Sequence, residues 1–342
     1  MKGRSIVIII LFSFSVILTN AQSTNKAGTS AAQFLKIGVG AEQTSMAGAT
    51  AALVSDESAM YWNPAGLVEV KRTGFYANFT NWFADIQHNY FGFVLPISSN
   101  QTIGVNATML TMDEMEVTTE LKPKGTGEFF EASDIAIGIS YSMQLVDFFS
   151  FGTTVKLISQ SIYNESASAF AFDMGTKLNT GFYGIKIGMA FTNFGTKLQL
   201  SGRDLERTFD PNKSSASNVG VISNLKTEAW ELPTNFRVGV GWDIINAHSA
   251  LMLSNEHKLQ LAVDANHPID SKENVVIGFG YTWRKLLSVR SGYHFNDDVR
   301  SWVVGLGLNW NIPNTANIGF DYAYSELDKL GDVHSFTVKL GL

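Results

Sequence analysis

The segment WVVGLGLNW at 302–310 indicates the fold class, because its large apolar side chains stand at the even-numbered positions and mostly small or polar residues stand between them. Successive side chains of a β-strand point to opposite faces of the sheet, so this pattern predicts a strand with one apolar face. The same period of two recurs at 259–265, 318–324 and 336–342. The second face carries Gly, Ala, Ser, Thr and Asn with scattered charges, which is typical of a crowded polar lumen whose other face meets lipid.

The same alternation, followed outward from this segment, predicts about 14 antiparallel strands after residue 72. The expected strands are 73–81, 87–97, 100–112, 130–144, 148–161, 168–180, 183–196, 233–245, 257–267, 273–284, 286–295, 300–312, 315–325 and 332–342. The two longest loops, 113–129 and 197–232, both follow odd-numbered strands, as in outer-membrane barrels with long external loops. The connection 246–256 breaks this rule, so either the strand count slips there or that turn is elaborated.

The composition favours a barrel in a membrane. Only 16% of the 342 residues are charged and 12% are aromatic, whereas soluble proteins carry about 25% charge. No stretch after Ala21 approaches the roughly 20 apolar residues of a spanning helix. A barrel strand shows only one face to lipid and needs no such run. The expected fold is therefore all-β, a transmembrane antiparallel β-barrel.

The N-terminus is typical of an export signal. Lys2 and Arg4 precede an apolar run at 6–18, and the small residues Thr19 and Ala21 frame a cleavage site. The alternative is an uncleaved anchor, for which the apolar run is too short. We expect a cleaved signal peptide at 1–21, an N-terminal plug at 22–72 and an outer-membrane barrel at 73–342.

Charge and residue usage exclude several functions. Removing Lys2 and Arg4 from the 25 basic residues leaves 23 against 31 acidic residues, a net charge of −8, which argues against nucleic acid as a partner. The chain has no cysteine, and its six histidines lack metal-ligand spacing. No Gly-x-Ser-x-Gly elbow is present. We expect a non-enzymatic protein without cofactor or metal, and a hydrolase hidden in the strands stays the alternative.

Residues 22–72 lack the strand alternation and are rich in Ala, Gly and Ser. Short helices are expected around 31–39 and through 45–54. Small residues allow close packing, so this segment is expected to fill the barrel as a plug that contains short helices. The alternative is a disordered periplasmic tail.

The plug ends in the motif Asn63, Pro64, Ala65 and Gly66. Pro64 fixes one backbone torsion and restricts Asn63, and Gly66 permits a tight conformation. The Asn63 side chain can bond neighbouring backbone groups in a turn. The motif predicts a rigid corner between plug and first strand, with a direct ligand role as the alternative.

The sequences SMAGATAA at 45–52 and DESAMYWNPAGL at 56–67 resemble the N-terminal signature of FadL-like barrels. Within that superfamily, AAQFLKIGVG at 31–40 and LPTNFR at 232–237 resemble the PorV/PorQ branch of Bacteroidetes. The resemblance implies a 14-stranded barrel with the N-terminal segment folded into the lumen.

The PorV/PorQ resemblance implies an interaction role. Such barrels are associated with type IX secretion, where they receive cargo from the translocon and present it at the cell surface. Secretion-system proteins and secreted cargo would then be partners, besides the lipid of the outer membrane. The candidate partner-binding residues lie in the 197–232 loop, for which a variable solvated loop is the alternative: Arg203, Asp204, Glu206, Arg207 and Asp210.

The FadL-like resemblance implies passage of hydrophobic compounds through a pocket. Plug residues that either line such a pocket for a hydrophobic small molecule or are simply packed are Phe34, Leu35, Met46, Met60, Tyr61 and Trp62. The expected inward face carries charges that disfavour a wide apolar passage: Lys156, Asp173, Lys177, Lys186, Lys258, Asp264, Asp321 and Lys339. The main prediction is therefore a secretion accessory, and transport is the alternative.

Overall fold

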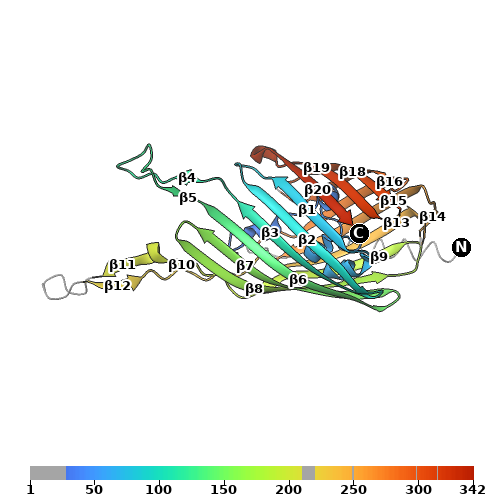
Figure 1. Ribbon diagram of the computed structural model, residues 1–342, viewed down its shortest axis with the longest axis horizontal. Coiled ribbons are helices and arrows are strands. Elements are labelled where there is room, and N and C mark those ends of the chain that lie inside the picture. The colour runs from blue at the N-terminus through green and yellow to red at the C-terminus, as the bar shows by residue number, and fades with distance from the viewer. Residues whose placement is uncertain (1–27, 210–219, 249, 298, 314) are drawn as a thin grey trace.

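The computed structural model describes residues 28–209, 220–248, 250–297, 299–313 and 315–342. Fourteen long strands form one antiparallel sheet that closes on itself as a barrel (Figure 1). The barrel closes because the first strand pairs with the second on one edge and with the last strand on the other. The prediction of an all-β antiparallel barrel of about 14 strands is confirmed.

The barrel strands are β1 (Gly74–Asn81), β2 (Gln87–Ser98), β3 (Gln101–Thr111), β6 (Ala132–Val146), β7 (Phe149–Ile162), β8 (Glu165–Asn179), β9 (Ile185–Gly195), β13 (Asn235–Asn246), β15 (His257–Pro268), β16 (Asn274–Trp283), β17 (Leu287–Phe295), β18 (Trp302–Ile312), β19 (Ala316–Glu326) and β20 (Asp332–Gly341). The short strands are β4 (Met115–Glu116), β5 (Phe129–Phe130), β10 (Ser201–Gly202), β11 (Glu206–Phe209), β12 (Val221–Asn224) and β14 (Met252–Leu253).

The helices are short. They are η1 (Gln33–Lys36), α2 (Ala41–Ser45), α3 (Ala59–Trp62), η2 (Pro64–Glu69), η3 (Arg203–Leu205) and η4 (Asp328–Leu330). In the described part of the chain, no helix has the length and apolar character to cross a membrane.

The strands turn their apolar faces outward, as the alternation predicts. On β8, Phe170, Phe172 and Met174 are exposed, whereas Ala171 and Asp173 between them are fully buried. A buried aspartate beside exposed phenylalanines is the reverse of a soluble protein, in which apolar groups are hidden from water. This inverted pattern is the one expected where lipid surrounds the barrel and a polar interior fills it.

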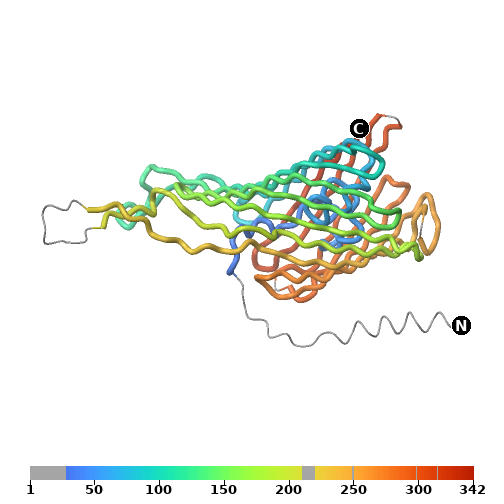
Figure 2. The backbone as a smooth tube through the Cα atoms, turned by 90° about the horizontal axis from the view of Figure 1, so that it is seen from below, coloured from blue at the N-terminus to red at the C-terminus, as the bar shows by residue number. Residues whose placement is uncertain are grey.

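The two ends of the barrel differ. At one end, which we call the loop end, the β4–β5 hairpin and the β10–β12 arm project beyond the wall (Figures 1 and 2). The opposite end, the turn end, carries short connections except for the long one between β13 and β15, for which the sequence left two alternatives open. The strand count holds there, and the turn is elaborated, because β14 pairs in parallel with the last residues of β13.

Residues 28–72, which we call the plug, lie inside the barrel over most of their length (Figure 2). Within them, the helix expected through 45–54 is wrong, because α2 already ends at Ser45. Ala47 and Gly48 follow with φ of 56° and 72°, in the left-handed region where a right-handed helix cannot continue. The helix expected around 31–39 is the shorter 3-10 turn η1.

Candidate functional site

The Asn-Pro-Ala-Gly motif fastens the plug to itself and to the wall. The fully buried Asn63 caps η2 by accepting a hydrogen bond from the Ala65 backbone N–H at 3.1 Å. Its amide donates to the carbonyls of Ala51 at 2.7 Å and Thr176 at 3.1 Å. The Ala65 carbonyl in turn accepts hydrogen bonds from two wall serines, Ser142 and Ser150. The motif therefore joins two parts of the plug and three strands.

Glycines on the inner face of the wall let the plug backbone approach closely. A Cβ added to Gly152 would overlap the Pro64 backbone, and one added to Gly175 would overlap the Asn63 side chain. Gly188 meets the carbonyl of Ala51 in the same way. Because only glycine leaves this space, the three positions set how deeply the motif seats in the wall.

Five charged side chains hold the other side of the plug. Glu42 and Asp56 of the plug meet Lys339 of β20 at 2.5 and 3.0 Å. Lys339 also lies 3.1 Å from Asp321 of β19, which pairs with Arg290 of β17 at 2.7 Å. Arg290 closes the cluster with a 3.1 Å contact to Glu42. Three strands are thereby tied to two plug residues, and we call these five side chains the ion cluster.

Glu42 of the ion cluster and the nearby Glu57 of the plug have pKa values shifted in opposite directions. Burial opposes ionisation of Glu42, but Arg290 and Lys339 outweigh it and hold the pKa of Glu42 well below its usual range. Burial, reinforced by the neighbouring Asp56, raises the pKa of Glu57 to about 7. Glu42 is therefore a fixed anion, and Glu57 changes its charge near neutral pH.

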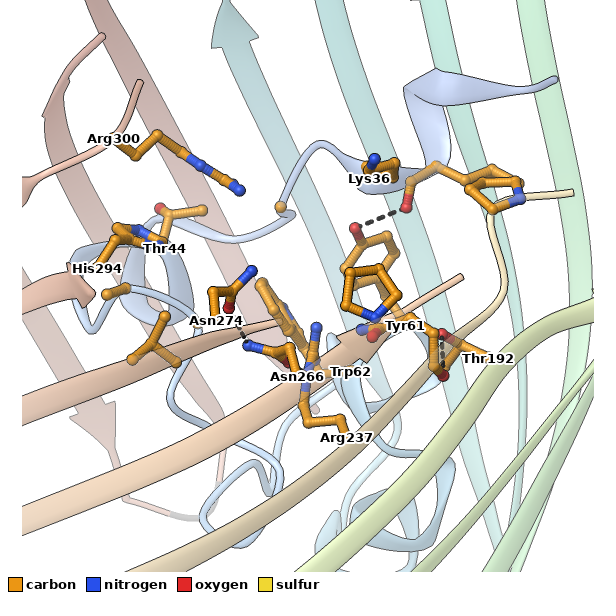
Figure 3. A pocket seen from close by; sticks show the side chains of 18 of the residues that line it. Lys36, Thr44, Tyr61, Trp62, Thr192, Arg237, Asn266, Asn274, His294 and Arg300 are labelled. Carbon is orange, nitrogen blue, oxygen red and sulfur yellow. Dashed lines mark hydrogen bonds between the residues drawn. The ribbon is translucent and has the colours of Figure 1, made fainter. Parts of the chain in front are cut away.

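A cavity of about 160 Å³ lies between the plug and the loop end of the barrel. Its plug side carries Tyr61 and Trp62 of α3 (Figure 3). Its wall side comes from strand ends next to the long loops, and the lining there includes Trp82, Lys156, Thr192, Asn193, Asn235, Arg237, Asn266, Asn274, Val276, His294, Arg300 and Val303. The lining is mixed, because aromatic and branched side chains stand among amides and cations.

Hydrogen bonds fix the aromatic floor of this cavity. The Trp62 indole N–H donates to the Val39 carbonyl at 2.8 Å. The Tyr61 hydroxyl lies 2.9 Å from the carbonyls of both Leu35 and Ile37, so its proton is shared between them. Burial raises the pKa of Tyr61 to about 12, so the phenol stays protonated. Both rings are therefore held by backbone that belongs to the plug.

At one side of the cavity, Asp270 of the wall binds the first residues of the plug. Asp270, in the loop between β15 and β16, accepts hydrogen bonds from Ser30 and Gln33 and pairs with Lys36 at 3.1 Å. Burial opposes its ionisation, but these donors together lower the pKa of Asp270. The start of the plug is thereby tied to a loop at the end of the barrel where the long loops lie.

A second cavity of about 380 Å³ lies at the turn end, between η2 and strands β6 to β9. Its lining includes Lys177 and Lys186, which pair with Glu69 at 2.7 Å and Asp243 at 3.0 Å. Lys71, the third cation in the lining, donates to the carbonyls of Val68 and Ser99. Since these cations all have partners in this chain, we place the candidate ligand site at the loop end.

The six plug residues that the sequence proposed for a pocket do not all lie at the same place. Leu35, Tyr61 and Trp62 line the loop-end cavity. Phe34, Met46 and Met60 are instead buried in three different apolar clusters against the wall. Their distribution places the aromatic pair of α3, rather than the methionines, at the candidate site.

The candidate partner-binding residues lie far from this cavity, on the projecting arm. Arg203 and Asp204 belong to η3, and Glu206 and Arg207 begin β11, where all four are exposed or nearly so. Asp210 lies outside the described residues. The arm is joined to the barrel by hydrogen bonds from Asn164 to Asp204 and from the Asp204 backbone to Glu165.

Sequence reasoning missed the wall residues of the cavity, above all Arg237, Asn266, His294 and Arg300. The signal that could have found Arg237 is its position on the inward face of β13, on which the small residues Gly239 and Gly241 follow it. Over the described ranges, no group of three or more His, Asp or Glu side chains is placed to hold a metal ion.

The described strands form a fourteen-stranded antiparallel barrel filled by the N-terminal segment, and this fold is shared with the solved structure of a Pseudomonas aeruginosa FadL homologue, at TM-score 0.54 and 11% identity over 89% of this chain and 98% of that one. The "CymD monoaromatic hydrocarbon channel" is similar at TM-score 0.55 and 12% identity, over 89% of this chain and 96% of that one. The toluene transporters TodX of P. putida and TbuX of Ralstonia pickettii both reach TM-score 0.56 at 11% identity, over 89% of this chain and 96% and 97% of theirs. Neither a protein-family model nor a curated protein matches the sequence.

Proposed function

We propose that this protein passes small hydrophobic compounds through the outer membrane. This is the transport function that the FadL-like resemblance implied. One observation carries the proposal: the cavity of about 160 Å³ over Trp62 and Tyr61 at the loop end. A cavity of about 150 Å³ is enough to bind benzene. The space therefore suits a compound with one ring that enters from outside and rests on the aromatic floor.

The structural neighbours support the same reading, because their names refer to monoaromatic hydrocarbons and toluene. At 11–12% identity they carry the fold, and the size of the cavity is what favours one-ring compounds for this chain.

The test is uptake of labelled toluene by cells that make the protein, compared with cells that lack it. Val276→Trp fills the cavity from the inner face of β16, and we expect it to reduce uptake severalfold. Val289→Trp is the matched control, because it adds the same side chain to the outer face of β17. Equal uptake with and without the protein, or normal uptake by Val276→Trp, rejects the proposal.

A second candidate function is supported by the arms at the loop end. The β11–β12 ribbon projects beyond the barrel wall (Figure 1), and its residues Phe209 and Ile222 are 61% and 71% exposed. Exposed apolar side chains on a projecting ribbon suit a protein partner. This would agree with a PorV/PorQ-type accessory of type IX secretion that binds secreted cargo or translocon proteins.

Replacing the ribbon by a short turn tests this second function. Loss of proteins from the cell surface, with the barrel still folded, would support an interaction role. An unchanged set of surface and secreted proteins would reject it.

A further inference from the structure

Arg237 is held in a fixed position in the loop-end cavity. Its guanidinium carbon lies 4.6 Å from the centre of the Trp62 ring, so the cation rests on the aromatic floor (Figure 3). Its Nε donates to Asn266 at 2.7 Å, and the amide of Asn266 donates to Asn274 at 2.8 Å. Among the described residues, the terminal nitrogens of Arg237 have no hydrogen-bond acceptor. The two terminal nitrogens of the Arg237 guanidinium are therefore the donors that remain available to a ligand.

The other cations around the cavity are already paired. Lys36 lies 3.1 Å from Asp270, Lys156 lies 2.8 Å from Asp173, and Arg300 lies 2.9 Å from Asp297. In the described part of the chain, no carboxylate lies within 4.0 Å of the Arg237 guanidinium.

The carboxylate that is nearest in register to Arg237 serves the plug. Asp264 stands opposite Gly239, two residues along the strand from Arg237. One of its oxygens accepts the backbone N–H groups of Thr50 and Ala51 at 3.0 and 2.8 Å. Asp264 thus moderates the charge of Arg237 at a distance and leaves its donors free for a ligand.

Two further polar atoms at the cavity lack partners. Both residues line the cavity, and among the described residues Asn235 Oδ1 and His294 Nδ1 are buried without a hydrogen-bond partner. The His294 side chain belongs to a residue that is only 9% exposed. Buried polar atoms are nearly always satisfied in proteins, so these two point to a ligand that carries polar groups besides its ring.

We propose that the ligand is an aromatic carboxylate with a single ring, bound through Arg237. The ring lies among Trp62, Val276 and Val303, and the carboxylate meets the free edge of the guanidinium in a two-point contact. Arginine matches a carboxylate in this way because both groups are planar and present two atoms at a similar spacing. The inference rests on the proposed function, since it takes the cavity as the place where the compound binds.

Binding of benzoate and benzamide to the purified full-length protein tests the inference by calorimetry. The two compounds have the same ring and nearly the same shape, but only benzoate is charged. Hydrogen bonds to charged groups are stronger than neutral ones, so we expect benzoate to bind about tenfold or more tightly. Equal affinities overturn the inference, whatever the variants do.

Variants of Arg237 test whether this residue causes the preference for benzoate over benzamide. We expect Arg237→Gln to remove the preference for benzoate and Arg237→Lys to keep only part of it, because lysine has the charge without the planar fork. Arg284→Gln is the matched control, since Arg284 also stacks on a tryptophan, Trp283 at 5.1 Å, but is exposed at the turn end. A full preference in Arg237→Gln overturns the assignment, and the heat-dependent gel mobility of each variant shows that its barrel is folded.

Toluene uptake separates this inference from the proposed function. If benzoate fails to bind while toluene uptake remains sensitive to Val276→Trp, the inference is wrong and the proposed function stands. If neither compound uses the cavity, both are wrong.

Discussion

Replacing Lys339 by methionine should release the plug from one side of the barrel. Methionine keeps most of the length of the side chain but removes its charge. In the native protein this one ammonium group contacts Glu42, Asp56 and Asp321 at 2.5, 3.0 and 3.1 Å. Without it, Glu42 and Asp321 share the single guanidinium of Arg290, and Asp56 loses its contact with the ion cluster.

The expected cost follows from the burial of the cluster. The side chain of Asp321 is fully buried and that of Lys339 is 15% exposed, so water replaces little of the lost interaction. Removing one partner of a buried ion pair costs about 3–5 kcal/mol. Since about 1.4 kcal/mol is a factor of ten, opening of the plug should become more frequent by about two to four orders of magnitude.

Hydrogen exchange of the plug amides measures this opening directly. Exchange between residues 41 and 57 should accelerate by that factor, while the central amides of the barrel strands keep their protection. Arg284→Gln is again the control, because its pair with Glu256 is more than half exposed on both sides and should be worth less than about 1 kcal/mol. Unchanged exchange of the plug in Lys339→Met would show that the ion cluster does not hold it.

Three further predictions concern the same segment. Gly175→Val should lower the free energy of unfolding by about 1–3 kcal/mol, because the new side chain overlaps Asn63, whereas Gly280→Ala should be nearly neutral with its nearest neighbour 3.6 Å away; urea midpoints in detergent compare them. Asn63→Ala removes the hydrogen bonds to the Ala51 and Thr176 carbonyls and from the Ala65 backbone N–H, and should cost about 1–3 kcal/mol in the same assay; a midpoint within error of the wild type would contradict this. Burial and Asp56 raise the pKa of Glu57 from 4.5 to about 7, so stability present below pH 4.5 is lost as the pH rises through 7. The wild type should therefore be less stable at pH 8 than at pH 5, and a Glu57→Gln variant with the same pH dependence would refute this assignment.

Most of the barrel could be predicted from the sequence, because each strand carries its own signal. The segment expected at 168–180 is β8 at Glu165–Asn179, and the one expected at 332–342 is β20 at Asp332–Gly341. The partition of side chains between lipid and lumen acts on every residue separately. The pattern is therefore local and survives without knowledge of the neighbouring strands.

The plug was less predictable than the barrel. Its helices are four to six residues long and are set by wall contacts, such as the bond from the Ala41 backbone N–H to Thr337 at 2.8 Å. Short apolar and small residues carry no period by which such a path can be read. The prediction of a helix through 45–54 failed for this reason.

The sequence by itself determined the strands, their apolar faces and the two sides of the barrel that differ in loop length. Only the tertiary structure decided which residues form the cavity, because Trp62, Arg237 and His294 lie far apart in the chain. Strand alternation predicts that Arg237 faces inward, but it does not say which plug residue lies opposite. That pairing depends on barrel closure and on how deeply the plug seats against the wall glycines, and both result from contacts between distant residues.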